Sequence, residues 1–200
     1  MVVTEAPSPD KRWFASVQDG NIMLRAPVDD RTVPLTTDGT PLFAWDIEAP
    51  RIKQTAGAEL ARHMLDPWSP DGHRLFAIKV DRGAVPELPL IRFLKREEEL
   101  CSVKIQRAGG PLDIAHPHVI DVLAKRARRF ELGDTENRYF TLIGWLPDGS
   151  EVLFTRHSRD FKRVDVLAGN PVDGSVRCVL SESAETFLAI QHDVIFFGDN

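Results

Sequence analysis

A short phrase that ends in a Pro-Asp-Gly turn recurs along the chain and constrains the fold more than any other feature. Residues 68–72 read Trp-Ser-Pro-Asp-Gly, residues 145–149 read Trp-Leu-Pro-Asp-Gly, and residues 8–10 are a shortened copy, Ser-Pro-Asp. An apolar segment that suits a β-strand follows each copy. Strands that follow such turns at repeated intervals are typical of radial or stacked β architectures. The repeat therefore predicts an all-β fold.

The spacing of turns and strands predicts a partial β-propeller of about three to four antiparallel blades, similar to TolB or WD40 repeats. Asp19-Gly20 marks the centre of a hairpin in the first blade. We place the blades at 8–40, 41–133 and 134–183, with the start of a further blade at 184–200. Residues 56–65 predict a short helix inserted between blades.

The predicted number of blades leaves a physical problem at the edges of the assembly. A closed propeller typically has about four to eight blades, and a smaller number leaves strand edges with unpaired backbone groups. We therefore interpret residues 1–200 as a single fragment of a larger propeller, or as a propeller that closes in an unusual way. The proline-containing segment at 86–91 is predicted not to be a central strand, because proline cannot donate to the ladder.

Composition and charge exclude several classes of function. The chain has 200 residues, of which 42% are hydrophobic and 28% charged, and its net charge is -5. These values are typical of a globular protein, and nothing in them calls for a nucleic-acid partner. No apolar run approaches the roughly 18 residues that a membrane helix needs. The first residues have no signal-peptide pattern, so the compartment stays open, with the cytoplasm favoured.

Three groups of reactive residues have ordinary structural interpretations. Cys101 and Cys178 are predicted to be reduced and partly buried thiols. His116 and His118 have no further ligands nearby, so we expect an exposed loop and no metal or other cofactor. The basic cluster at 125–129 is predicted to be a solvated strand end or turn. Arg156, Arg159 and Arg163 are expected to form ion pairs between blades or to line the central channel.

Several motifs together resemble a known family. Residues 69–72 and the segment Asp-Arg-Gly-Ala-Val-Pro at 81–86 match its blade start and the Val-Pro segment that follows. Residues 106–110 are similar to its Tyr-Pro-x-Ala-Gly loop, without the aromatic residue and the proline. Residues 145–149 and 156–165 resemble its Trp-x-x-Asp-Gly and Arg-x-x-Arg patterns. The chain thus looks like the N-terminal propeller of dipeptidyl peptidase IV-like serine peptidases, in the prolyl oligopeptidase superfamily.

This resemblance implies a propeller that filters peptide substrates and covers a separate hydrolase domain. In the family, a C-terminal α/β-hydrolase domain of the same protein carries the serine nucleophile. The Gly-x-Ser-x-Gly sequence of that nucleophile does not occur in these 200 residues. We therefore expect no catalytic residue in this chain, with the hydrolase domain and the peptide substrate as its partners.

The resemblance also implies a place where the free amino group of a substrate is held. The family uses carboxylates on a short helix after a tryptophan, and the corresponding stretch here begins at Trp45. Glu48 matches the start of that acidic cluster, and Glu59 is a second candidate if the loop has been rebuilt. Ala49 and Pro50 stand where further carboxylates are expected. The alternative is that both glutamates are solvated loop residues.

Two other interpretations remain open at this point. The chain could be a freestanding protein-binding propeller without any chemistry, because propellers carry many unrelated functions. It could also be a fragment whose sheet edges pair with another copy, which would make it a homo-oligomer.

Overall fold

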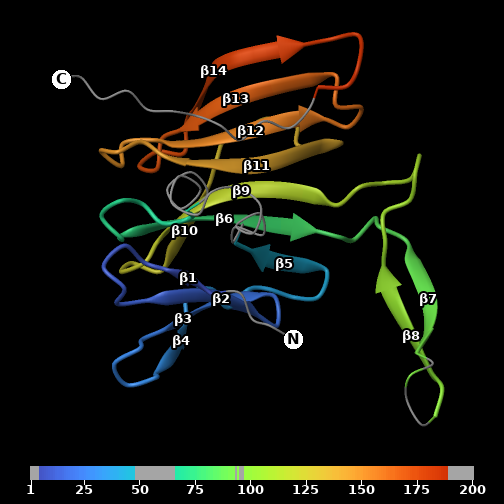
Figure 1. The fold of residues 1–200 in the computed structure, drawn as a ribbon, viewed down its shortest axis with the longest axis horizontal. Helices are drawn as coiled ribbons and strands as arrows, with labels where there is room; N and C mark the ends of the chain where they lie inside the picture. The colour runs from blue at the N-terminus through green and yellow to red at the C-terminus, as the bar shows by residue number, and fades with distance from the viewer. Residues whose placement is uncertain (1–4, 48–65, 93, 95–96, 189–200) are drawn as a thin grey trace.

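The chain folds into three four-stranded sheets and a separate hairpin. Residues 5–47, 66–92, 94 and 97–188 are described by the structure, which is a computed structural model. Within those residues the chain forms antiparallel β-strands and no helix, which confirms the predicted all-β class. The sheets follow one another in chain order, and the hairpin projects to one side (Figure 1). The helix predicted at 56–65 lies outside the described residues.

Every strand belongs to one of these four units. The first sheet contains β1 (Ala6–Pro7), β2 (Phe14–Gln18), β3 (Asn21–Arg25) and β4 (Thr32–Pro34). The second contains β5 (Phe43–Asp46), β6 (Arg74–Asp81), β9 (Ile114–Asp121) and β10 (Arg126–Arg129). The third contains β11 (Arg138–Trp145), β12 (Val152–Ser158), β13 (Arg163–Gly169) and β14 (Val176–Ser183). The hairpin consists of β7 (Glu87–Arg92) and β8 (Glu99–Lys104).

The recurring turn is held by its own side chains. In the second sheet Ser69 Oγ donates to Asp71 Oδ1 at 2.5 Å, and the same oxygen accepts from the His73 amide at 2.9 Å. The serine–aspartate bond also forms in the turns that begin at Ser8 and at Ser158. The copy at 158–161 has no proline or glycine, so the sequence motif did not reveal it. The copy at 145–149 keeps the Pro-Asp-Gly letters but has Leu146 in place of the serine, so Asp148 accepts from Ser150 instead. The bond and the letters therefore recur partly independently.

The second sheet is buried on both faces. Along β6, Leu75 and Ala77 join a cluster with residues of the first sheet, whereas Phe76 and Ile78 join a cluster with residues of the third. Successive side chains of a strand point to opposite faces, so the strand is apolar on both faces from Leu75 to Ile78. The three sheets therefore pack face to face, as neighbouring blades of a propeller do.

Two tryptophans of the repeat connect neighbouring sheets. Trp68 Nε1 donates to the Ala6 carbonyl at 3.0 Å, and Trp145 Nε1 donates to the Pro67 carbonyl at 3.1 Å. Ala6 and Pro67 occupy the same place, two residues before the first residue of their turns. Both indole rings are buried. Each ring therefore contributes apolar area and satisfies a buried carbonyl of the preceding sheet.

The two-strand hairpin, which we call the arm, is inserted between β6 and β9 of the second sheet. Its strands pair only with each other among the described residues, which agrees with the prediction that 86–91 is no central strand. The predicted basic cluster lies mostly in β10, the exposed edge of the second sheet, as expected. Cys101 and Cys178 are free, but Cys178 is exposed rather than partly buried because it lies on the edge strand β14.

We predict that Trp68→Phe destabilises the fold by about 1–3 kcal/mol, because the Ala6 carbonyl loses its donor while the ring area is largely kept. Trp13→Phe is the matched control, since Trp13 is only partly buried and its indole has no hydrogen bond to a described residue. Urea unfolding measures both changes. Equal shifts in the two midpoints would show that the indole hydrogen bond adds nothing.

Candidate functional site

The segment that contains Glu48 leaves the edge strand of the second sheet. β5 pairs with β6 up to Asp46, opposite Ile78, and Trp68 resumes the pairing opposite Leu75. Among the described residues, the pairing along this edge of the sheet therefore stops at Asp46 and begins again at Trp68. Ile47 and Trp68, near the two ends of the interruption, are both buried. Glu48 and Glu59 themselves lie outside the described residues.

The strand before this segment is fixed by a polar and aromatic cluster. Trp45 is buried, and its Nε1 donates to Asp38 Oδ1 at 2.7 Å. Lys79 pairs with the other Asp38 oxygen, and its Nζ lies 5.1 Å from the centroid of the Trp45 ring. Burial raises the pKa of Asp38, but hydrogen bonds from Lys79 and Trp45 outweigh it and leave the pKa below its ordinary value. The carboxylate thus stays charged and fixes both partners.

The two histidines belong to this cluster, which corrects the expected exposed loop. Both lie within β9, and His118 packs edge-on against Trp45 with the ring centroids 4.9 Å apart. Burial lowers the pKa of His118 to about 4, so the ring is neutral at pH 7. Pro117 is tolerated in this inner strand because its nitrogen and carbonyl face the same side, away from β6. The carbonyl accepts from the Phe130 amide just past the end of β10, so the missing N–H costs no bond to β6.

The described residues contain no group of three or more His, Cys, Asp or Glu side chains that could hold a metal ion. His118 Nδ1 instead lies 2.6 Å from the His116 carbonyl, and His116 Nδ1 lies 3.3 Å from Thr135 Oγ1. A neutral His118 donates its Nδ1 proton to that carbonyl. The histidines therefore have structural partners within their own sheet and in the segment that follows β10.

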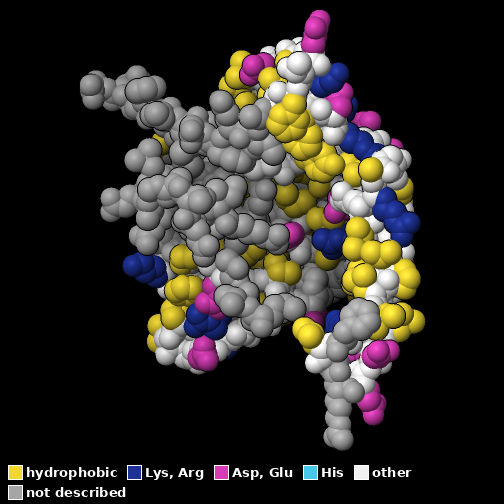
Figure 2. Space-filling view, turned by 45° about the vertical axis from the view of Figure 1, so that its right-hand side comes forward, with side chains coloured by type: hydrophobic (Ala, Val, Ile, Leu, Met, Phe, Trp, Pro, Cys, Tyr) yellow, Lys and Arg dark blue, Asp and Glu magenta, His cyan; other side chains and the backbone are white. Residues whose placement is uncertain are grey.

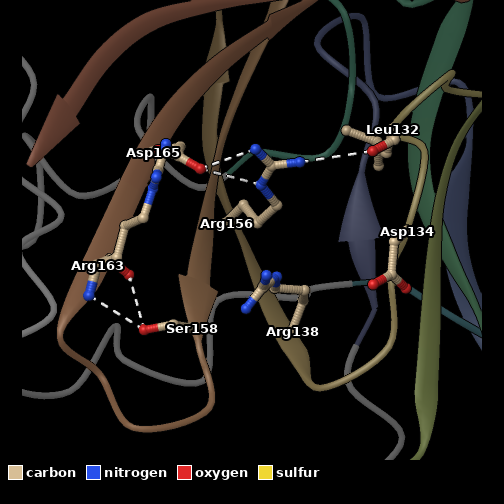
Figure 3. A pocket seen from close by; sticks show the side chains of 7 residues that line it. All are labelled: Leu132, Asp134, Arg138, Arg156, Ser158, Arg163 and Asp165. Atoms are coloured by element: carbon tan, nitrogen blue, oxygen red, sulfur yellow. Dashed lines mark hydrogen bonds and ion pairs between the residues drawn. The ribbon is translucent and has the colours of Figure 1, made fainter.

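A polar pocket of about 260 Å³ opens beside the third sheet (Figure 3). Its walls come from the segment after β10 and from β11, β12 and β13. Three of the side chains are arginines and two are aspartates. The lining residues are Leu132, Asp134, Arg138, Arg156, Ser158, Arg163 and Asp165.

Asp165 organises one wall of the pocket. It is 3% exposed and accepts from Arg156 Nη2 at 2.8 Å, from Arg163 Nε at 3.0 Å and from Ser181 Oγ at 2.7 Å. Burial raises the pKa of Asp165, but these hydrogen bonds outweigh burial and leave the pKa below its ordinary value. Arg156 and Arg163 therefore pair within the third sheet, and the expectation of ion pairs between blades is wrong for them.

Arg159 reaches outside the third sheet, to the loop that precedes β9. Its Nη2 donates to the Gly110 carbonyl at 2.6 Å, and its Nη1 donates to Asn137 Oδ1 at 3.0 Å. Gly110 lies in the loop between the arm and β9. The Ala-Gly loop and the second arginine of the Arg-x-x-Arg pattern matched the family separately in sequence. In the structure these two segments are in contact. This contact fixes the base of the arm against the third sheet.

Comparison with known proteins identifies the family. The family described as dipeptidyl peptidase IV (DPP IV) N-terminal region matches residues 2–200. The chain belongs to this family. It is 27% identical over 165 residues to a probable dipeptidyl-aminopeptidase B of Emericella nidulans, covering 74% of the chain and 18% of that protein. A similarly named Aspergillus niger protein is 24% identical over 157 residues, covering 71% of the chain and 17% of that protein.

Solved structures share the fold of this DPP IV N-terminal region. A dipeptidyl peptidase 4 of Porphyromonas gingivalis superposes with a TM-score of 0.73 at 21% identity, covering 92% of this chain and 26% of the other. A putative dipeptidyl aminopeptidase IV of Bacteroides ovatus gives 0.71 at 17% identity, with 92% and 24% covered. The chain thus spans about a fifth of the length of its curated relatives. No helix in the described part is long and apolar enough to cross a membrane.

Sequence reasoning missed the partners that fix Trp45. Asp38 and Lys79 are 41 positions apart in the chain and belong to no motif. The sequence gives only one sign of this cluster, which is that Lys79 is a charged residue among the apolar residues of a predicted strand. Pairing β5 with β6 places Lys79 directly opposite Trp45, and this pairing could not be read from local patterns.

We predict that the Asp165 network makes stability depend on pH. A carboxylate whose folded pKa is depressed stabilises the fold above the unfolded pKa of about 3.9, and this contribution is lost as the pH falls through the folded pKa. Asp165→Asn should therefore cost about 3 kcal/mol at pH 7, because two arginines lose their carboxylate, and less below pH 3. Denaturant midpoints at both pH values measure this.

Asp134→Asn is the matched control, because Asp134 lines the same pocket but is exposed. It should change stability little at either pH. A cost for Asp165→Asn that is equal at pH 7 and pH 3 would contradict the assigned role.

Proposed function

We propose that this chain is the substrate-gating, non-catalytic propeller region of a dipeptidyl peptidase IV-like serine exopeptidase. The observation that carries the proposal is the family match over residues 2–200, together with consecutive four-stranded sheets and the lack of a Gly-x-Ser-x-Gly sequence in the chain. Peptide hydrolysis would belong to a C-terminal hydrolase domain of the same protein. The propeller would restrict access to that domain by size and orientation.

We further propose that Glu48, with Glu59 as a second candidate, binds the free amino group of the substrate. Two carboxylates can hold one ammonium group by charge-assisted hydrogen bonds, which positions the peptide from its N-terminus. The anchoring of Trp45 by Asp38, Lys79 and His118 supports this assignment, because it fixes the strand from which the Glu48 segment departs. The edge strand of a blade is a suitable origin, since first strands line the channel of a closed propeller.

We predict that Glu48→Ala in the full-length protein lowers kcat/KM on a dipeptide substrate with a free amine by about tenfold or more, mainly through KM. The loss reflects the ammonium–carboxylate bond made in both the ground state and the transition state. Glu59→Ala tests the second candidate in the same assay. An unchanged kcat/KM for both variants would remove the proposed amine site.

The control substrate carries an acetylated amino group. It lacks the charge that the glutamates recognise, so its low activity should be the same in the wild type and in Glu48→Ala. A parallel loss on both substrates would indicate damage to the fold rather than loss of amine binding.

The arm supports a second proposal, that the protein associates with a second copy of itself. Ile91 and Leu100 are opposite each other on the arm and are 48% and 73% exposed. Leu94, at the tip, is completely exposed. In the space-filling view the arm projects at the lower right, with hydrophobic side chains exposed along that side of the molecule (Figure 2).

A second arm is the partner that fits these features. An isolated two-stranded hairpin is marginally stable in water, so its exposed apolar face and free edges favour a further strand or hairpin. The arm carries both acidic and basic side chains, among them Glu87, Arg92 and Lys104, so a copy related by a two-fold axis can place opposite charges together.

We predict that Leu100→Asp shifts the protein towards the monomer by at least about tenfold in dimer Kd, because a charge replaces an apolar side chain at the contact. Leu123→Asp is the matched control, since Leu123 is 82% exposed just after β9. Sedimentation equilibrium measures both. A wild type that stays monomeric at every concentration would exclude self-association through the arm.

A further inference from the structure

The polar pocket beside the third sheet carries an unbalanced positive charge. Three guanidinium groups line it, and two carboxylates oppose them. Asp165 is buried and already accepts from Arg156, Arg163 and Ser181, so it has little capacity for a further donor. Asp134 accepts from the Glu136 amide at 2.8 Å. The side chains that line the pocket therefore carry one positive charge in excess, and its buried carboxylate, Asp165, is already paired.

Arg138 is the source of this excess. Its guanidinium has no hydrogen bond or ion pair with any residue that the structure describes, although the side chain is half-buried. Figure 3 shows it inside the pocket, between Asp134 and Arg163, with its guanidinium directed away from the Asp134 carboxylate. Arg25, Arg156 and Arg177, by contrast, each form a two-bond contact with a carboxylate. A guanidinium with five free donors in a concave site is suited to a planar anion.

We propose that this pocket binds the carboxylate group of a ligand through Arg138. Arg163 uses only its Nε toward Asp165, so its terminal nitrogens can contribute further donors. The excess of one positive charge matches a singly charged carboxylate better than a phosphate dianion. A cavity of about 260 Å³ has room for a carboxylate with a short aliphatic stem.

The network around Asp165 prepares the site for this ligand. Its ion pairs hold Arg156 and Arg163 in place before any anion arrives, which lowers the ordering cost of binding. The site depends only on residues of the third sheet and of the segment before it. It does not depend on Glu48, on Glu59 or on the peptidase assignment, so the two proposals can fail separately.

The test is an NMR titration of the purified protein that follows the arginine Nε–H signals. The probes are acetate, a tripeptide with one glutamate and both ends blocked, and inorganic phosphate, with sodium chloride at matched ionic strength as the reference. We expect saturable shifts with acetate or the peptide. Saturation by acetate alone assigns the site to free organic acids, and tighter binding of the peptide assigns it to an acidic side chain.

Arg138→Gln should weaken the carboxylate Kd by at least about tenfold, and Arg138→Lys should give an intermediate loss because it keeps the charge but not the planar fork. Arg31→Gln is the matched control, since it removes the same charge from an exposed turn of the first sheet. Equal Kd values in the Arg138→Gln and Arg31→Gln variants would overturn the proposal. Shifts that chloride reproduces, or tighter binding of phosphate than of carboxylate, would also overturn it.

Discussion

The burial of both faces of the second sheet is the constraint on which the rest of this structure depends. A sheet that carries apolar side chains on both faces needs a neighbour on each, because apolar side chains are stabilised by removal from water. In β6 the alternation of Leu75 and Phe76 distributes apolar side chains to both neighbours. The hydrogen bonds of Trp68 and Trp145 then fix the position of each sheet relative to the preceding one. Any contact between residues of different sheets depends on this packing.

The two ends of the sheets have different roles. The Ser-Pro-Asp turns and the repeat tryptophans occupy one end, where local hydrogen bonds repeat from sheet to sheet. Residues of the Trp45 cluster and of the polar pocket lie toward the other end. Trp45, Lys79 and His116 lie there in the second sheet, and Arg138 and Ser158 lie there in the third. One end therefore carries the repeated turns and tryptophans, whereas the other carries the Trp45 cluster and the polar pocket. The proposed carboxylate pocket lies at the end of the third sheet that is equivalent to the Trp45 and Lys79 end of the second sheet.

Local patterns predicted most of the strands, because turns and strands depend on neighbouring residues. The hairpin at Asp19-Gly20 and the sheet that follows Trp145 formed as expected. β1 was missed because it is only two residues long, too short for any period to appear. His116 and His118 were misplaced because the lack of further metal ligands nearby indicated an exposed loop. Only the pairing with β6 and the early end of β10 explains why Pro117, between them, is tolerated in an inner strand.

The sequence by itself determined the class of fold, the repeat and the family resemblance, since each rests on short motifs whose physics is local. It also located the residues proposed to bind the amine, which the described part of the chain does not contain. The tertiary structure decided which charges meet. Arg163 lies two residues from Asp165 on the same face of β13, but the strand register selected Arg156 as the second partner and left Arg138 without one among the described residues. Register and sheet packing are properties of residues distant in the chain, so no local pattern encodes them.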